Sequence, residues 1–380
     1  MKFNVAIVGG AGHIGLPMSC FIQNKGIDTL IVDKNVEALR LIKDSTPPFE
    51  EENFKSNLED ANKNGLKLTT DISEIKNCNV VIITLGTSSN KEDKLLFDTV
   101  IQDVLKNIQE NSILILRSTI ERGLLESVDK EHNPTNKGVV LAYCPERLAE
   151  GFAFEEIETL PQIVGTKNES DFLIVKSFFE VLGINSLSVN YKEAEFIKLF
   201  INTYRYSQFS LLNSFSNIAK KNAIDFKKVL EISKQEYPRL EGVPDSGFVG
   251  GPCLIKDSKT FMNSYDDEIG IINNLLEVNK EFMNLTVSDI KKQFLSKRFI
   301  QLGITFKPNS DDLRDSQSLE LYNILLKEGF EIEIVEPNIK GYKKYNEVES
   351  FSDNVLISTF HDEFKNLDFS NKKVIVIGNK

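Results

Sequence analysis

Short apolar runs alternate with longer amphipathic stretches over the first half of the chain. These runs cover residues 3–9, 29–32, 79–85, 112–116 and 139–142. Runs this short, rich in β-branched residues, are typical of strands buried inside a parallel sheet. Strands that alternate with helices imply a doubly wound α/β sheet, and right-handed crossovers bring the strand ends along one crevice.

The hydrophobic pattern changes near residue 190. Residues 192–222 contain no proline and keep a helical period throughout, which predicts one long helix. A second α/β pattern begins at Arg298, with further strands expected at residues 331–335, 354–358 and 373–377. A chain of 380 residues exceeds a single hydrophobic core. We therefore predict two Rossmann-like doubly wound domains joined by a long central helix and a helical domain, with boundaries at residues 1–190, 191–290 and 291–380.

A glycine turn follows the first predicted strand. Gly10, Gly12 and Gly15 form the pattern G-x-G-x-x-G, and a helix is expected directly after them. The glycines let a pyrophosphate reach the helix N-terminus, where free N–H groups favour anions. His13 and Ile14, inside the same turn, are expected to contact the cofactor.

An acidic residue ends the second predicted strand. Asp33 follows Gly15 at close to the ~20-residue spacing of dinucleotide-binding folds. Its carboxylate would bind the adenosine ribose and repel a 2′-phosphate, which favours NAD over NADP. Lys34 beside it weakens that preference. A flavin site or a purely structural glycine turn stays open as an alternative.

Polar residues follow the later strands, at the edge where such sheets bind ligands. Thr87 follows one strand and is a candidate cofactor contact, although ordinary turn chemistry explains it about as well. Thr119 follows the next strand. Glu146, Arg147 and Glu150 follow the one after it.

The predicted long helix carries polar residues along one face. Glu195, Lys198, Asn202, Arg205 and Phe209 follow one another at steps of three or four residues. A solvated charged face is the simpler interpretation. Apolar residues flank this face, however, which suits a buried domain connector or a subunit interface. We therefore predict that Lys198 and Asn202 line a site.

A cysteine follows a pair of glycines at residues 250–253. The glycines let the backbone approach a bulky neighbour, and Pro252 stiffens the approach to Cys253. Lys256 and Asp257 follow closely. A cationic neighbour favours the nucleophilic thiolate, and the aspartate could act as a base, orient water or balance the lysine charge. A buried structural cysteine remains the alternative.

Composition and charge indicate a globular protein and argue against a membrane protein or a nucleic-acid-binding protein. A hydrophobic fraction of 41% and a charged fraction of 27% are typical of a globular chain, and no apolar run reaches the ~18 residues of a membrane span. The chain opens directly into a strand and not into a signal peptide. Four widely spaced cysteines suggest neither a metal site nor disulfides, so we expect a cytoplasmic protein. A net charge of −11 argues against nucleic acid as a general partner.

With these motifs in order, the chain resembles the nucleotide-sugar 6-dehydrogenases, the family of UDP-glucose and UDP-N-acetylmannosamine dehydrogenases. Residues 143–147 are more similar to the N-acetylhexosamine branch than to the glucose branch. The motifs that carry the resemblance lie at residues 10–17, 118–119, 145–146, 195–202, 250–257, 303–308 and 312–316.

The resemblance implies NAD-dependent oxidation of a sugar C6 alcohol to the carboxylate in two steps, as in polysaccharide biosynthesis. Cys253 matches the family nucleophile, which forms a thiohemiacetal and then a thioester. Lys198 matches the lysine that stabilises the alkoxide and oxyanion, with Asn202 as a neutral donor beside it. Asp257 matches the family aspartate that helps to activate water. Thr119 matches the residue that places this water, and Glu146 lies nearby in the family site.

The same resemblance implies binding residues and a partner. The C-terminal domain is expected to bind the UDP half of the substrate, and the long helix is expected to build a homodimer. Cofactor contacts are expected at Thr119, Glu150, Lys256 and Arg314. Substrate contacts are expected at Glu146, Arg147, Lys198, Asn202, Gly250, Lys307 and Arg239, and Arg239 could come from the same chain or from a neighbouring subunit.

The sequence departs from the family pattern in places. Residues 85–88 replace the usual V-P-T-P, Asn213-Ser214 replaces an Asn-Glu pair, and residues 376–380 lack an Asp-x-Arg. Two other functions stay open. A two-electron dehydrogenase of the 3-hydroxyacid type would leave Cys253 and Lys256 without a role, and a non-catalytic NAD-binding protein would need neither.

Overall fold

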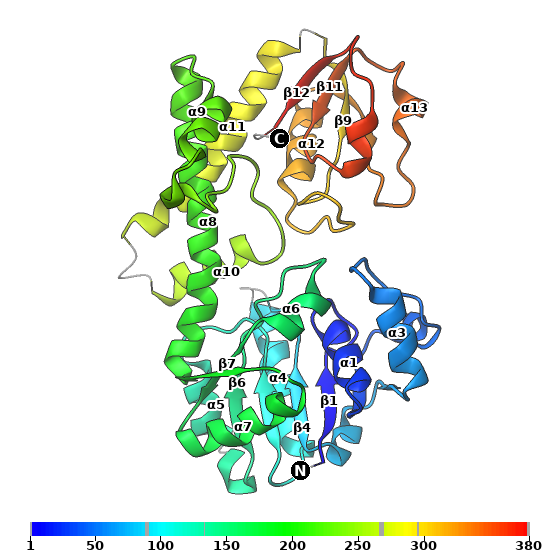
Figure 1. The fold of residues 1–380 in the computed structure, drawn as a ribbon, viewed down its shortest axis with the longest axis vertical. Helices are drawn as coiled ribbons and strands as arrows, with labels where there is room; N and C mark the ends of the chain where they lie inside the picture. Colours follow the sequence, from blue (N-terminus) through cyan, green and yellow to red (C-terminus); the bar gives the residue numbers. More distant parts are fainter. Residues whose placement is uncertain (1, 88–90, 133, 266–269, 295, 378–380) are drawn as a thin grey trace. The chain divides into compact units, whose positions relative to one another are not determined.

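The chain divides into two compact units within one long helix. The computed structural model describes residues 2–87, 91–132, 134–265, 270–294 and 296–377. The first unit ends at Phe200 and the second begins at Ile201, both inside α8 (Tyr191–Lys221). This helix confirms the long central helix expected from residues 192–222, and the course of the chain can be followed in Figure 1.

An eight-stranded sheet organises the first unit. Its strand order is β3-β2-β1-β4-β5-β6-β7-β8, and the pairs from β3 through to β6 are parallel. This arrangement confirms the predicted doubly wound sheet. The strands are β1 (Asn4–Val8), β2 (Asp28–Val32), β3 (Lys67–Thr69), β4 (Val80–Ile83), β5 (Ile113–Leu116), β6 (Val140–Tyr143), β7 (Gln162–Thr166) and β8 (Ser186–Asn190).

Three strands of this sheet are absent from the sequence prediction. β3 is only three residues long, and β8 is an edge strand whose residues are mostly exposed, so neither forms an apolar run. β7 is fully buried but short, and it pairs antiparallel with β6 and parallel with β8. The sheet is therefore mixed at this end, where β7 runs antiparallel to β6.

Helices cover both faces of the sheet because alternate strand residues point to opposite sides. One core cluster joins α1 and α7 to residues such as Ile7 and Ile82, and a second joins α4 and α5 to neighbours such as Val8 and Ile83. The helices are α1 (Gly15–Asn24), α2 (Val36–Lys43), α3 (Phe54–Lys63), α4 (Lys91–Asn107), α5 (Leu124–His132), α6 (Ala153–Thr159) and α7 (Glu169–Val181).

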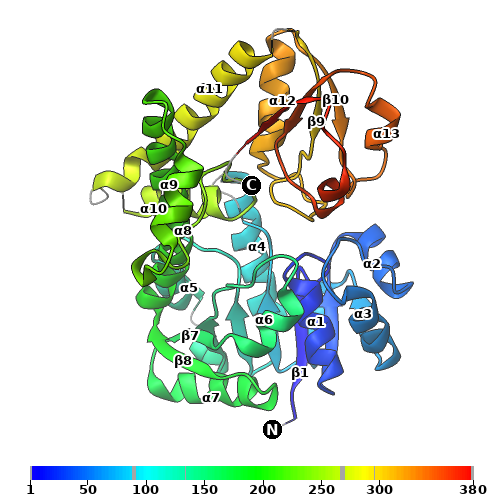
Figure 2. The same cartoon turned by 45° about the horizontal axis from the view of Figure 1, so that its top comes forward.

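The second unit contains a smaller parallel sheet and several helices. The strand order is β10-β9-β11-β12, and α11 and α12 pack on one face through Ile290 and Leu321. Figure 2 shows α12 beside these strands. The elements are α9 (Phe226–Lys234), α10 (Leu254–Ser264), α11 (Leu275–Gln293), β9 (Arg298–Leu302), α12 (Gln317–Lys327), β10 (Glu331–Val335), α13 (Tyr345–Val348), β11 (Asn354–Ile357) and β12 (Lys373–Val376).

Membrane-spanning helices and clusters of metal-binding side chains are both absent from the described residues. None of the helices there is both long enough and apolar enough to cross a membrane. Over the same part of the chain, no group of three or more His, Cys, Asp or Glu side chains is arranged to hold a metal ion.

Candidate functional site

The glycine turn has two packed positions and one open position. A Cβ at Gly10 would lie 2.7 Å from the Ile7 carbonyl oxygen, and one at Gly15 would lie 2.6 Å from the Gly10 Cα. These two glycines let strand, turn and helix α1 pack closely. A Cβ at Gly12 would meet only the Gly9 carbonyl oxygen, at 3.5 Å. The open side of the turn at Gly12 is therefore where a pyrophosphate could approach the N-terminus of α1.

Asp33 lies against the glycine turn. Its Oδ2 accepts a hydrogen bond from the Ala11 backbone N–H at 3.0 Å, and its Oδ1 accepts one from the Asn35 N–H at 2.9 Å. The carboxylate thus sits beside the glycine turn at the carboxyl end of β2, as a ribose-binding acid requires. Lys34 next to it is exposed, and His13 stacks on Phe49 with ring centroids 4.0 Å apart.

Thr87 and Thr119 meet at the same edge of the sheet. The Thr87 hydroxyl donates a hydrogen bond to the Thr119 carbonyl oxygen at 2.7 Å, which joins the ends of the neighbouring strands β4 and β5. With the open side of Gly12 and the carboxylate of Asp33, this edge fits an NAD molecule. Those residues, with Ile14 in the turn, would hold the cofactor. Its pyrophosphate would lie at the glycine turn and its ribose at Asp33.

Glu146 is held by an arginine that sequence analysis did not assign to a site. Arg117 Nε donates to Glu146 Oε2 at 3.0 Å, and its Nη2 bonds the same oxygen. Burial alone would raise the pKa of the Glu146 carboxyl, but the charge and hydrogen bonds of Arg117 outweigh it and hold that pKa below its ordinary value. This pairing fixes the Glu146 carboxylate at the end of β5, and its Oε1 accepts hydrogen bonds from the backbone N–H groups of Arg147 and Leu148.

Lys198 reaches the same turn from α8. Its side chain is buried, and Nζ donates a hydrogen bond to the Glu146 carbonyl oxygen at 2.7 Å. Arg147 donates to the Pro161 carbonyl oxygen, and Glu150 is partly buried in the loop before α6. The structure therefore places the amine of Lys198 at the Glu146 turn, and it occupies the guanidinium of Arg147 with a backbone acceptor.

Glu195 anchors the start of α8. Its buried carboxylate accepts hydrogen bonds from the backbone N–H groups of Gly123 (2.8 Å) and Leu125 (3.2 Å) at the N-terminus of α5. A helix N-terminus favours an anion at this point. Burial nevertheless raises the pKa of Glu195 above its ordinary value. Glu195 lies about one turn before Lys198, and its contact with α5 fixes α8 against the loop that follows Thr119.

The cysteine loop packs tightly on a loop of the second unit. A Cβ at Gly250 would lie 2.6 Å from the Asp315 carbonyl oxygen, and one at Gly251 would lie 2.7 Å from the Phe306 ring. Gly251 also has a φ of +92°, which side-chain-bearing residues rarely adopt. The paired glycines thus allow the close approach that the sequence indicated, with the Phe306 ring as the bulky neighbour.

Cys253 is exposed and occupies the N-cap position of α10. The partial positive charge at a helix N-terminus stabilises a thiolate, so the helix adds to the effect expected from a nearby lysine. The exposed thiol contradicts the alternative of a buried structural cysteine. Cys20, Cys78 and Cys144 are buried, and burial raises the pKa of the Cys78 thiol to about 11 and those of the other two to about 12.

Asp257 lies fully buried one turn after Cys253. Its Oδ2 accepts a hydrogen bond from Asn202 Nδ2 at 2.5 Å, and its Oδ1 lies 3.2 Å from Lys256 Nζ. A buried carboxylate needs such partners to compensate for its lost hydration. The structure therefore unites Asn202 on α8 with Lys256 and Asp257 on α10, residues far apart in the sequence.

Asn213 holds the start of the cysteine loop. Its Oδ1 accepts from the Gly247 N–H at 2.8 Å, and its Nδ2 donates to the Gly247 carbonyl oxygen at 2.9 Å and to Asn279 Oδ1 at 2.8 Å. From the sequence, Asn213 was noted only as part of the Asn213-Ser214 pair that departs from the family motif. Its position on the buried side of a predicted helix was the available signal.

A cavity of about 420 Å³ opens beside the cysteine loop in the second unit. Lys307 and Gly250 line it, and their substrate contacts stay a prediction. Arg205 and Phe209 also line it. The helical spacing placed both on the same face as Lys198 and Asn202, but the sequence suggested no role for them. The remaining lining residues are Asp245, Ser246, Gly247, Phe248, Val249, Leu254, Phe306, Pro308, Ser318, Ile357, Ser358, Thr359, Phe360, Val376 and Ile377.

Two predicted binding residues lie apart from this cavity wall. Arg239 is exposed, does not line the cavity, and lies over the Tyr237 ring at 5.4 Å. A substrate contact from Arg239 within its own chain thus has no support here, and a contact from a neighbouring subunit stays a prediction. Arg314 is half exposed and pairs with the buried carboxylate of Asp312. Its predicted cofactor contact also stays a prediction.

Comparison with known proteins assigns the family. The chain matches the UDP-glucose/GDP-mannose dehydrogenase family over its NAD binding domain (residues 3–182), central domain (residues 192–281) and UDP binding domain (residues 300–379). It is similar to the UDP-N-acetyl-D-mannosamine dehydrogenase of Methanocaldococcus jannaschii, with 26% identity over 94% of this chain and 86% of that protein.

Solved structures agree with this assignment. The UDP-N-acetyl-mannosamine dehydrogenase of Staphylococcus aureus has a TM-score of 0.84 and 26% identity, covering 98% of this chain and 92% of that chain. The fold is also that of the UDP-D-ManNAc dehydrogenase of Pyrococcus horikoshii, with a TM-score of 0.90, 23% identity, and coverage of 99% and 95%. The chain therefore belongs to the UDP-glucose/GDP-mannose dehydrogenase family and is an NAD-dependent UDP-sugar dehydrogenase.

Proposed function

We propose that the chain oxidises the C6 hydroxyl of a UDP-N-acetylhexosamine to the carboxylate, through covalent intermediates on Cys253. The observation that carries this proposal is the exposed thiol at the N-terminus of α10, about one turn before Asp257, whose buried carboxylate pairs with Asn202 and Lys256. A two-electron dehydrogenase needs no nucleophile, so this arrangement favours a second oxidation step.

The proposed chemistry has four balanced stages. NAD, replaced once during the reaction, would supply the hydride acceptor for each of the two oxidations, so that two NADH would form per sugar. Removal of two electrons from the alcohol gives the C6 aldehyde, and the Cys253 thiolate adds to it to give a thiohemiacetal. The second oxidation converts this adduct to a thioester. Water, activated with the help of Asp257, then hydrolyses the thioester, releasing the carboxylate and restoring the thiol.

Lys198 and Asn202 are proposed to stabilise the negative charge that develops on the C6 oxygen. Both side chains are buried and lie one turn apart on α8, so the helix holds an ammonium and a neutral amide donor in a fixed spacing. Preorganised donors of this kind cost no reorganisation during the reaction. A reduced thiol is required throughout, which fits the cytoplasmic location expected from the cysteines.

The cavity of the second unit has the composition that a UDP group requires. Arg205 and Lys307 supply positive charge for the diphosphate, and aromatic rings including Phe209 and Phe306 supply faces for the uracil base. The volume of about 420 Å³ lies within the range of ordinary ligand sites. Relatives that carry the name UDP-N-acetyl-D-mannosamine dehydrogenase favour an N-acetylated sugar over glucose.

The test is the stoichiometry of oxidation. The purified protein should be incubated with NAD and with limiting UDP-ManNAc, UDP-GlcNAc, UDP-GalNAc or UDP-glucose in turn. We expect two NADH per sugar and a uronic acid product from an N-acetylated substrate. One NADH per sugar, with aldehyde or ketone product, would support the two-electron alternative. Tight NAD binding with no turnover on any sugar would support a non-catalytic protein.

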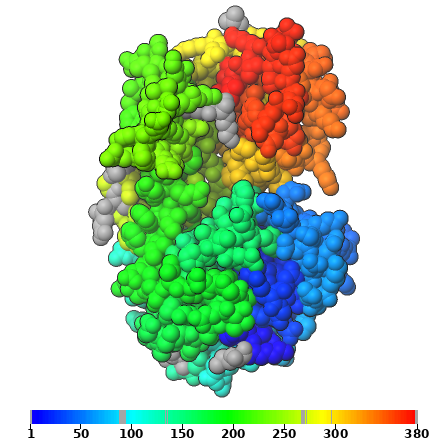
Figure 3. Space-filling view, in the orientation of Figure 1, coloured from blue at the N-terminus to red at the C-terminus, as the bar shows by residue number. Residues whose placement is uncertain are grey.

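A homodimer through α8 is proposed as the working assembly. Tyr204, Leu211, Phe215 and Ile218 follow helical spacing along one face of α8, and each side chain is about half exposed. In the space-filling view of Figure 3, green marks the stretch of chain that includes α8. A long apolar stripe on a helix is typical of a protein interface.

Leu211→Glu should convert the dimer to a monomer. The glutamate places a charge at the centre of the apolar stripe, where burial against a second copy would require its desolvation. Sedimentation equilibrium should give twice the 43.0 kDa chain mass for the wild type and a single chain mass for the variant. Leu173→Glu, at an equally exposed leucine on α7, is the control and should remain dimeric. A monomeric wild type, or a dimeric Leu211→Glu protein, would refute the interface.

A further inference from the structure

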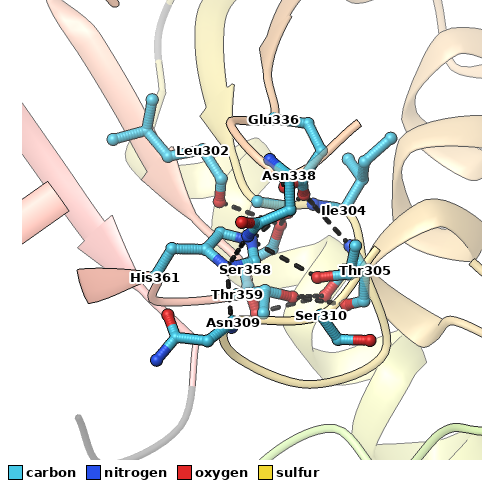
Figure 4. Close-up of polar contacts among 12 residues, drawn as sticks. Leu302, Ile304, Thr305, Asn309, Ser310, Glu336, Asn338, Ser358, Thr359 and His361 are labelled. Atoms are coloured by element: carbon cyan, nitrogen blue, oxygen red, sulfur yellow. Dashed lines mark hydrogen bonds and ion pairs between the residues drawn. The ribbon is translucent and has the colours of Figure 1, made fainter. Parts of the chain in front are cut away.

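Three turns of the four-stranded sheet meet at one buried histidine. They follow the carboxyl ends of the adjacent strands β10, β9 and β11 and comprise residues 336–338, 303–309 and 358–362. Figure 4 shows His361, from the turn after β11, among polar residues of the other two turns. The His361 side chain is completely buried and does not itself line the 420 Å³ cavity.

The hydrogen-bond partners of His361 define its protonation. Nδ1 lies 2.9 Å from the backbone nitrogen of Asn309 and 2.9 Å from the side-chain Nδ2 of Asn338. A backbone N–H can only donate, so Nδ1 accepts and carries no proton. Nε2 therefore carries the proton and donates it to Glu336 Oε2 at 3.1 Å. His361 is thus a neutral ring that accepts on one side and donates on the other.

Glu336 extends this link to the start of the turn after β9. Its Oε2 accepts hydrogen bonds from the backbone N–H groups of Ile304 (2.8 Å) and Thr305 (3.3 Å), and its Oε1 accepts one from the Asn338 N–H (3.2 Å). The carboxylate is as buried as the histidine. The His361–Glu336 pair consequently binds backbone N–H groups at both ends of the segment 304–309.

Asn309 needs this support because of its backbone conformation. Its φ is +55°, in the left-handed region that residues other than glycine rarely adopt. The side chain pairs reciprocally with Asp362, donating to Oδ2 at 2.9 Å and accepting from the backbone N–H at 3.0 Å. With the His361 bond, three contacts hold Asn309 against the turn after β11.

The segment fixed in this way forms part of the cavity wall. Residues 306–308 lie between the two backbone anchors, and all three line the cavity. The Thr305 hydroxyl donates a further hydrogen bond to the Lys307 carbonyl oxygen at 2.9 Å. Residues 359–360, which directly precede His361, line the same cavity. One imidazole therefore ties together two segments that face the ligand.

We infer that His361 is a positioning residue for nucleotide binding, which sets the place of Lys307 and the neighbouring wall through its Nδ1 acceptor and Nε2 donor. The identity of the ligand as UDP rests on the proposed function. A misplaced cation would weaken its contact with a diphosphate, whereas NAD binding by the first unit does not depend on this segment. The inference therefore predicts a selective loss of UDP affinity.

Two substitutions of His361 test its Nδ1 acceptor and its Nε2 donor separately. His361→Asn keeps an oxygen that can accept from the Asn309 N–H at the position of Nδ1 but cannot reach Glu336. His361→Gln can reach Glu336 with its amide but leaves the Asn309 N–H without an acceptor. Calorimetry with UDP should give a Kd raised by ~10-fold or more for His361→Gln and by less than ~3-fold for His361→Asn, with the Kd for NAD unchanged in both. His132→Gln, at an exposed histidine on α5, is the matched control.

Hydrogen exchange of the Asn309 amide provides an independent reading. This amide should be protected in the wild type and in His361→Asn, and should exchange rapidly in His361→Gln. If UDP affinity is unchanged in both variants, or falls equally in both in step with their melting temperatures, His361 only packs the core and the inference is wrong. If the wild type binds no UDP, the proposed function fails, and Asn309 exchange alone decides: equal rates in the three proteins would overturn the inference.

Discussion

Cys253→Ala should lower the rate of carboxylate formation by at least ~10³-fold, within the range seen when a covalent nucleophile is removed. Without the thiolate, no thiohemiacetal forms, and the second oxidation has no bound adduct on which to act. Product analysis by chromatography, together with NADH absorbance, measures both steps. NAD affinity should be unchanged because the thiol belongs to the second unit and the glycine turn to the first.

Iodoacetamide supplies the matching chemical test. The exposed Cys253 at the N-terminus of α10 should be alkylated near neutral pH, and activity should fall in proportion. Burial raises the pKa of the Cys78 thiol to about 11, so that residue should remain unlabelled and Cys78→Ala should retain activity. A Cys253→Ala protein that still yields two NADH per sugar would exclude covalent catalysis.

Lys198→Met should lower kcat by ~10²–10³-fold, the usual effect of removing one donor that stabilises an oxyanion. The thioether keeps the length and much of the packing of the lysine stem but has no charge. The Glu146 carbonyl oxygen, which accepts from Lys198 Nζ at 2.7 Å, loses that donor, yet the Arg117 pairing still holds the turn. Steady-state kinetics should show the loss in kcat, with little change in the Kd for NAD.

Lys192→Met provides the control for this substitution. Lys192 lies on the same helix, is largely exposed, and pairs with Glu126 at 3.3 Å on the surface. Surface ion pairs contribute little to stability, so this variant should fold and turn over like the wild type. A Lys198→Met protein within ~3-fold of wild-type kcat would remove Lys198 from the catalytic group.

The apolar pattern predicted the strands that form an unbroken apolar run and the long helix with an unbroken helical period. The runs at residues 3–9 and 79–85 became β1 and β4, and the proline-free segment 192–222 became α8. The pattern failed at β8, because an edge strand with one solvated side has no continuous apolar run, and at β3, which is three residues long. A strand is recognised from sequence only where its apolar residues are continuous, and β7, although fully buried, is interrupted by Gln162, Gly165 and Thr166.

Several site residues followed from the sequence because their chemistry depends on near neighbours. Gly10, Gly12 and Gly15 form one turn, and Cys253 follows two glycines whose missing side chains admit Phe306 and the Asp315 carbonyl oxygen. Glu146 pairs with Arg117, which comes from another strand end. A pairing across strands cannot be inferred from the residues beside it in the chain.

The sequence alone determined the glycine turn, the acid after β2, the long helix and the cysteine loop, since each is set by residues close together along the chain. Only the tertiary structure decided that Asn202 binds Asp257, that Arg205 and Phe209 line the cavity, and that His361 links Asn309 to Glu336. These contacts join positions tens of residues apart, and the packing of helices and strand ends, not local spacing, brings their side chains within hydrogen-bond distance.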